Sequence, residues 1–94
     1  MIPVCGIYKI TNLSNGKFYV GLSRNVQRRF IDHRTPRSLR SNRVIVRAMR
    51  KHGIHNFAFT VLEECGADKL AERERFWIAC LQPHYNMNEG GLGN

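Results

Sequence analysis

An Asn15-Gly16 pair between two short runs rich in isoleucine, valine, tyrosine and phenylalanine constrains the fold of this chain more than any other feature. Asn-Gly readily takes the two positive φ values of a two-residue type I′ loop, and β-branched and aromatic residues favour strands. The segment therefore predicts a β-hairpin in which Ser14 faces Lys17 and Gly21 lies opposite Ile10. A glycine at that place would let a ligand backbone approach closely.

The hairpin places two tyrosines on one face. Because successive side chains of a strand point to opposite faces, Tyr8 and Tyr19 project together from the side that also carries Gly21. Aromatic rings can simply fill a sheet surface, and the hairpin alone favours that interpretation slightly over a reactive pair. Ile10 and Asn12 share the tyrosine face, and the opposite, apolar face carries Cys5, Ile7, Phe18, Val20 and Leu22.

Length and charge limit what kind of protein this can be. A chain of 94 residues suits one small domain with one core. Its net charge of +8 favours a polyanionic partner, either nucleic acid or an acidic membrane surface. Because no apolar run approaches the roughly 20 residues that span a bilayer and no signal-peptide pattern is present, we expect a soluble, cytoplasmic protein. Its three scattered cysteines favour neither a disulfide framework nor a zinc site.

The basic residues are concentrated in the middle of the chain. Ten of the fifteen lie between Arg24 and Lys51, where Asp32 is the only acid, and six of the seven acids lie from Glu63 onward. The middle region is predicted to contact phosphates, because arginine suits bidentate phosphate contacts, although a solvated basic face is the alternative. The predicted nucleic-acid contacts are Lys17, Arg24, Arg28, Arg40, Arg43, Arg47, Arg50 and Lys51.

A first helix is predicted from Ser23 or Arg24 to His33, ending before a proline that disfavours helix at the preceding residue. Helical spacing places Val26, Phe30 and His33 on one side, with Arg29 at its edge. A cation beside an apolar stripe is costly unless it meets an anion. An arginine that reaches solvent and a histidine satisfied in the core have about even odds as the alternative.

Residues 34–41 read as a basic loop, and a second helix is predicted from Asn42, a good N-cap, to Gly53, a good C-terminal stop. Its cations lie opposite Ile45 and Met49, so one face could follow a nucleic-acid backbone. A strand over 57–62 follows. Its imperfect alternation predicts a central strand that is partly covered on both faces.

A last helix is predicted over 67–81, with Asp68 as its cap. Glu74 falls in the middle of the apolar side of that helix, between Trp77 and Ile78 in angle. Burying a carboxylate is expensive without a cation, so Glu74 should meet an arginine, a metal ion or both. A structural salt bridge to Arg29 is the alternative to a metal site.

Taken together, these features resemble the GIY-YIG nuclease family over nearly the whole chain. Val20 stands where the family name has isoleucine. Some of the similar homing endonucleases carry a further histidine between the first two helices, which this chain lacks between Arg34 and Lys51. The matching residues are Gly6-Ile7-Tyr8, Tyr19-Val20-Gly21, Arg29, His33, Lys51-His52-Gly53, Glu74-Arg75-Phe76-Trp77-Ile78 and Tyr85-Asn86.

The resemblance implies an α+β fold, a small three-stranded antiparallel sheet packed with helices. It also implies hydrolysis of a DNA phosphodiester with one divalent metal, Mg²⁺ or another such as Mn²⁺, held by Glu74. Tyr8 would be the general base, with Tyr19 hydrogen-bonded nearby, and neighbouring positive charge would have to favour the phenolate. Arg29 would stabilise phosphoryl charge. The expected catalytic residues are Tyr8, Tyr19, Arg29, His33, Glu74 and Asn86.

The resemblance is closest to the catalytic module of phage and intron homing endonucleases. A non-catalytic nucleic-acid-binding module and a repair or restriction nuclease of the same family are the alternatives. Residues 1–94 are expected to form a single catalytic domain whose glycine-rich end, 89–94, begins a linker or tail. DNA is the expected partner, and the sequence leaves the oligomeric state open, a monomer included.

Overall fold

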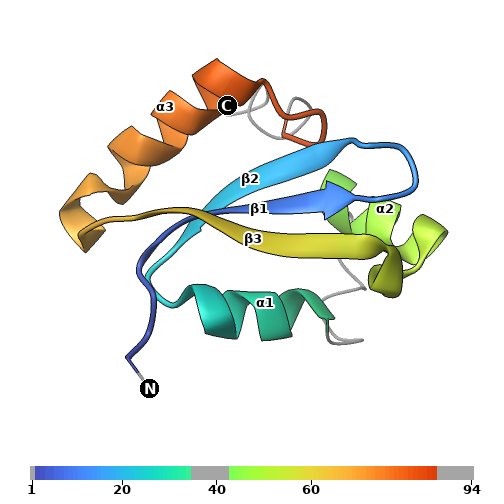
Figure 1. The fold of residues 1–94 in the computed structure, drawn as a ribbon, viewed down its shortest axis with the longest axis horizontal. Helices are drawn as coiled ribbons and strands as arrows, with labels where there is room; N and C mark the ends of the chain where they lie inside the picture. The colour runs from blue at the N-terminus through green and yellow to red at the C-terminus, as the bar shows by residue number, and fades with distance from the viewer. Residues whose placement is uncertain (1, 35–42, 87–94) are drawn as a thin grey trace.

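The computed structural model describes residues 2–34 and 43–86, which form a three-stranded antiparallel sheet between two layers of helices. Helices α1 (Val26–Arg34) and α2 (Val44–His52) cover one face, and α3 (Leu70–Leu81) covers the other (Figure 1). The predicted α+β class is confirmed. Arg40, most of the basic loop over 34–41 and the expected linker at 89–94 lie outside the described residues.

Strands β1 (Gly6–Asn12) and β2 (Phe18–Ser23) form the predicted hairpin, but the predicted register is wrong. Tyr8, rather than Ile10, faces Gly21. The reason lies in Asn12, whose Oδ1 accepts the N–H of Ser14 (2.9 Å) and so starts the turn before the Asn-Gly pair. Gly16 has a φ of 78°, whereas Asn15 does not take the positive φ that a type I′ loop requires.

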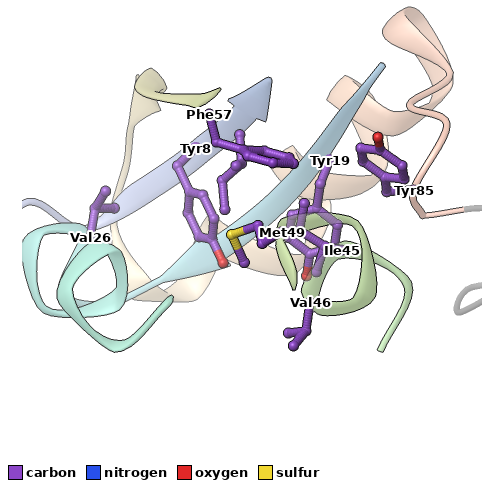
Figure 2. Close-up of a cluster of buried hydrophobic side chains, with 9 residues drawn as sticks. Tyr8, Tyr19, Val26, Ile45, Val46, Met49, Phe57 and Tyr85 are labelled. Atoms are coloured by element: carbon purple, nitrogen blue, oxygen red, sulfur yellow. The ribbon is translucent and has the colours of Figure 1, made fainter. Parts of the chain in front are cut away.

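The corrected register leaves each side chain on its predicted face, because the pairing is displaced by two residues and the side-chain period is two. One core contains the tyrosines, packed with Val26 of α1 and Ile45 and Met49 of α2 (Figure 2). The other lies under α3 and contains Ile7, Val20 and Leu70. The hairpin therefore separates a core that contains the tyrosines from one whose buried residues are aliphatic.

Strand β3 (Phe57–Glu64) lies at the edge of the sheet, which corrects the prediction of a central strand. The order is β2-β1-β3, so β3 pairs with β1 alone. Its imperfect alternation has a different cause: Ile7 faces Glu63 and Tyr8 faces Val61, which makes Leu62 the extra residue of a β-bulge. Val61 is 44% exposed, as an edge position permits.

The helix ends differ by a few residues from those predicted. Helix α1 begins at Val26 because Asn25 accepts the N–H of Arg28 (3.0 Å) as an N-cap. Arg43 takes the N-cap position of α2, and Gly53 ends it as predicted. Short 3₁₀ turns precede β3 and α3, at Ile54–Asn56 and Ala67–Lys69.

Asp68 does not cap α3, because it lies within the 3₁₀ turn that comes before the helix. Lys69 holds the N-cap position without a side-chain hydrogen bond. Among residues 2–34 and 43–86, no helix is long and apolar enough to cross a membrane.

Candidate active site

Two tyrosines and a histidine form a buried polar cluster between the sheet and the helices α1 and α2. The Tyr8 hydroxyl shares a hydrogen bond with Nε2 of His33 (3.3 Å). The ring centroids of Tyr8 and Tyr19 lie 6.3 Å apart, and both lie about as far from His33. Figure 2 shows both phenol rings projecting from the strands toward the side that α1 and α2 cover. The structure thus brings together three of the predicted catalytic residues.

Gly21 makes room for this cluster. A Cβ at that position would lie 2.5 Å from the Tyr8 hydroxyl oxygen and 2.9 Å from Cε2 of Tyr19. The space that the sequence suggested for a ligand backbone is therefore filled by the two tyrosine rings. The glycine holds the rings close to β2.

His33 is neutral at physiological pH. Burial, followed by the positive charges of Arg29 and Arg43, lowers its pKa to about 4. Its side chain is 4% exposed. A neutral imidazole can accept as well as donate a hydrogen bond, so His33 can orient the Tyr8 hydroxyl.

We expect the neutral His33 to make stability depend on pH. Because its pKa is about 4 in the fold against 6.5 in the unfolded chain, its contribution is complete above pH 6.5 and is lost as pH falls toward 4. Urea unfolding should show a loss of roughly 2 to 3 kcal/mol between about pH 7 and pH 4.5. Other titrating groups cancel in the comparison with His33→Gln, which should lack this part of the slope. Parallel pH profiles for the two chains would contradict a neutral buried imidazole.

The pKa of the Tyr8 hydroxyl is unusually high, although its surroundings include groups that lower it. Burial and the neighbouring Tyr19 raise it above its usual value, while the charges of Arg29 and Arg43 lower it by less. Arg29 and Arg43 supply positive charge of the kind that a general base needs, but they lower the pKa by less than burial raises it. The Tyr8 hydroxyl is therefore protonated in the metal-free domain.

Glu74 projects from α3, on the far side of the sheet, and is half-buried. Burial raises its pKa, and the charges of Arg43 and Arg75 partly oppose that rise. The expected alternative, a salt bridge with Arg29, does not occur within the described part of the chain. Its negative charge nevertheless acts on Tyr8, so the carboxylate reaches the cluster electrostatically.

An open cleft of about 560 Å³ joins the two sides of the sheet past the end of β2. Arg24, Arg28 and Arg29 line it on the α1 side, while Ala67 of the 3₁₀ turn and Ala71 of the first turn of α3 line it on the other. Arg28 is held by Asp32 at 3.2 Å. With three arginines and one acid, Asp32, along its walls, the cleft is basic.

Asn86 lies against the backbone of β2. It accepts the N–H of Val20 and donates its amide to the Val20 carbonyl, each at 2.8 Å. Both ends of its amide are thus used to complete the open edge of β2 beside Tyr19. These two hydrogen bonds tie the segment after α3 to β2.

The predicted nucleic-acid contacts fall into two groups. Arg24 and Arg28 line the cleft, and Arg47, Arg50 and Lys51 lie exposed on α2. Lys17 is exposed in the hairpin loop, and in the described structure no hydrogen bond or ion pair links it to the polar cluster.

Two side-chain contacts around this part of the sheet were missed from the sequence. Arg43, predicted only to contact nucleic acid, donates from Nη2 to the Tyr19 hydroxyl at 2.6 Å. Asn12 donates to the Tyr85 hydroxyl at 3.1 Å, which fixes the chain after α3. An asparagine on the strand face that also carries Ile10 and the two tyrosines was a signal for the second contact. No pattern indicated the first, because it depends on how α2 approaches β2.

The donor set suits a hard divalent cation. No group of three or more histidine, cysteine or acidic side chains that could hold a metal occurs within 2–34 and 43–86. One half-buried carboxylate, Glu74, fits an ion such as Mg²⁺, which usually takes one or two carboxylates and completes its shell with water and phosphate oxygens. The site does not fit zinc, which needs several nitrogen or sulfur ligands.

Comparisons with known proteins identify the family of this chain. The model of the GIY-YIG catalytic domain matches residues 4–86. The chain therefore belongs to the GIY-YIG catalytic domain family and is a nuclease domain. The catalytic domain of the homing endonuclease I-TevI superposes with a TM-score of 0.70 at 34% identity, over 83% of this chain and 88% of that one.

Two proteins of Enterobacteria phage T4 are also similar. Intron-associated endonuclease 1 is 35% identical over 95% of this chain, and the putative endonuclease segE is 33% identical over 93%. The chain spans only 39% and 42% of the lengths of these relatives. It corresponds to about two-fifths of each protein.

Proposed function

We propose that this chain hydrolyses DNA phosphodiester bonds with the help of a divalent cation at Glu74, as the catalytic domain of a homing-type endonuclease. The observation that carries the proposal is the convergence of polar side chains on Tyr8. Its hydroxyl hydrogen-bonds His33 of α1, its ring lies beside that of Tyr19 of β2, and Arg43 at the start of α2 donates to the Tyr19 hydroxyl. Packing alone does not explain why buried phenols hydrogen-bond both an imidazole and an exposed cation.

The proposed division of labour follows from these surroundings. Tyr8 takes a proton from the attacking water, whose oxygen bonds to phosphorus as the bond to the leaving sugar oxygen breaks. The leaving oxygen takes up a proton from solvent, so the products are a phosphomonoester and a hydroxyl. Arg29 lies at the cleft wall, where its charge stabilises the phosphoryl oxygens. His33 orients the Tyr8 hydroxyl.

A base role for Tyr8 needs more positive charge than the two arginines supply, because its pKa lies above the usual value. A divalent cation at Glu74 would supply that charge and would also polarise the phosphate. Mg²⁺ fits the single carboxylate best, and Mn²⁺ has similar ligand preferences.

The DNA is proposed to lie along the cleft and the exposed side of α2. The cleft supplies Arg24 and Arg28, and α2 supplies Arg47, Arg50 and Lys51. We further propose that residues 1–94 act as one catalytic domain in the cytoplasm and that target selection resides elsewhere. The T4 relatives, more than twice as long as this chain, support that division.

Nicking of supercoiled plasmid distinguishes an enzyme from a binding module. In Mg²⁺ the unaltered chain should convert supercoiled plasmid to open circles, and Arg29→Ala should bind the plasmid in a gel-shift assay but nick it far more slowly. Binding without nicking by the unaltered chain would support the non-catalytic alternative. If the unaltered chain does nick DNA, mapping the nicks on random DNA would separate homing from restriction behaviour.

Tyr8→Phe tests the base assignment, because the change removes only a hydroxyl. We expect the nicking rate at saturating protein to fall by about 10² to 10³-fold, as is typical when a general base is removed. Tyr85→Phe is the matched control, since it removes a buried hydroxyl that contacts Asn12 outside the cluster. Full activity of Tyr8→Phe would assign the proton to another acceptor.

A further inference from the structure

Arg43 lies at the start of α2 and contacts the cluster of tyrosines and His33 through its side chain. It occupies the N-cap position with extended backbone angles, and its carbonyl accepts the N–H of Arg47 at 3.0 Å. Its backbone is therefore fixed to the first turn of α2. The side chain itself is exposed.

The guanidinium of Arg43 contacts a side chain that is otherwise buried. Its Nη2 donates to the hydroxyl of Tyr19 at 2.6 Å, and its Cζ lies 5.6 Å from the centre of that ring. Tyr19 is only 5% exposed, and the centroid of its ring lies 6.3 Å from the ring centroids of both Tyr8 and His33. An exposed cation thus touches the interior of the cluster through one phenol.

The charge of Arg43 extends further than this single contact. It acts on Tyr8, His33 and Glu74, whereas that of Arg29 acts on the first two. Among the described residues, Arg43 is thus the one arginine whose charge acts on all three. Arginine is suited to such a place because its planar fork can hold a phenol and face a phosphate at the same time.

We propose that Arg43 is a positioning residue that couples the basic side of α2 to the catalytic tyrosines, so that DNA bound along α2 fixes the Tyr19 hydroxyl beside Tyr8. The inference rests on the proposed nuclease function. It assigns to Arg43 a role distinct from that of Arg47, Arg50 and Lys51, which lie exposed on α2. Those residues provide affinity, and Arg43 provides the orientation of the site.

Single-turnover nicking at saturating protein separates orientation from affinity. We expect Arg43→Met to lower the saturating rate by about 100-fold, a size typical for a lost preorganised donor. Its Kd for DNA, measured without a divalent cation, should rise by about tenfold or less, as expected for one lost phosphate contact. Arg43→Lys keeps the charge but not the fork, and should recover part of the rate. Lys69→Met is the charge-matched control on an exposed site away from the cluster, and should keep the full rate.

A double-mutant cycle tests the contact itself. Tyr19→Phe removes the hydrogen-bond acceptor, so Arg43→Met combined with it should be no slower than the slower single variant. Two outcomes would overturn the inference: a full saturating rate in Arg43→Met with only a raised Kd, or effects of the two changes that simply multiply.

A spectroscopic measurement keeps the inference testable apart from nicking. Duplex DNA added to the unaltered chain should change the tyrosine ultraviolet difference spectrum, and the change should shrink at least twofold in Arg43→Met. Binding without any tyrosine signal would also overturn the coupling. Failure of the unaltered chain to nick DNA, with the tyrosine signal present, would instead contradict the proposed function.

Discussion

Glu74→Gln is expected to lower the nicking rate by about 10³-fold, the upper range for loss of one group that stabilises transition-state charge. The change keeps the size of the side chain but removes the negative charge that a divalent cation needs. Because burial raises the pKa of Glu74, its ionised form destabilises the fold at neutral pH. We therefore expect the variant to unfold at the same or a higher urea concentration than the unaltered chain.

Glu72→Gln is the matched control for this prediction. Glu72 is exposed on the same helix, so its replacement removes an equal charge without reaching the cluster. Supercoiled plasmid should be nicked normally by this variant. A Glu74→Gln chain that remains folded and nicks at the full rate would remove the carboxylate from the mechanism.

Gly6→Ala is expected to have the largest effect on stability, a loss of about 3 kcal/mol or more in urea unfolding. A Cβ at Gly6 would overlap the backbone carbonyl oxygen of Glu63, at the bulge where β3 pairs with β1. No rotamer change can relieve a clash between backbone atoms. The strands would have to separate at this point, and the neighbouring Tyr8 would shift with β1.

Gly66→Ala shows whether the effect of Gly6→Ala is specific to the bulge. Gly66 has an ordinary φ of −69°, and a Cβ there would meet only the carboxylate end of Asp68, an exposed side chain that can move. Its replacement should change the free energy of unfolding by less than about 0.5 kcal/mol. Equal losses for the two variants would mean that the bulge does not determine the requirement for Gly6.

Much of the fold was predictable because it depends on local patterns. The alternation of the hairpin placed Tyr8 and Tyr19 on one face and the aliphatic residues on the other, as observed. Helical spacing likewise placed His33 inward. The strand register was not predictable from the Asn-Gly pair, because the side chain of Asn12 selects an earlier turn. The edge position of β3 depends on long-range pairing, which the local pattern does not contain.

The proposed catalytic cluster was predictable as a set of residues but not as a set of contacts. Glu74 stood out as a charge on an apolar helical face, and the structure places it half-buried. Arg29, the alternative salt-bridge partner considered for Glu74, instead lowers the pKa values of Tyr8 and His33 through its charge. The helices α1 and α3 cover opposite faces of the sheet, and neither helical pattern encodes their relative position (Figure 1).

The raised pKa of Tyr8 has a direct consequence for metal dependence. Without a cation the phenol stays protonated, so the tyrosine cannot accept a proton from water. The measurement that tests this account most directly is the single-turnover nicking rate of the unaltered chain as a function of Mg²⁺ concentration. We predict no cleavage in a chelator and a saturable rise in rate as Mg²⁺ is added. An equal rate with and without the chelator would contradict the assignment of Glu74 and Tyr8 to one metal-assisted site.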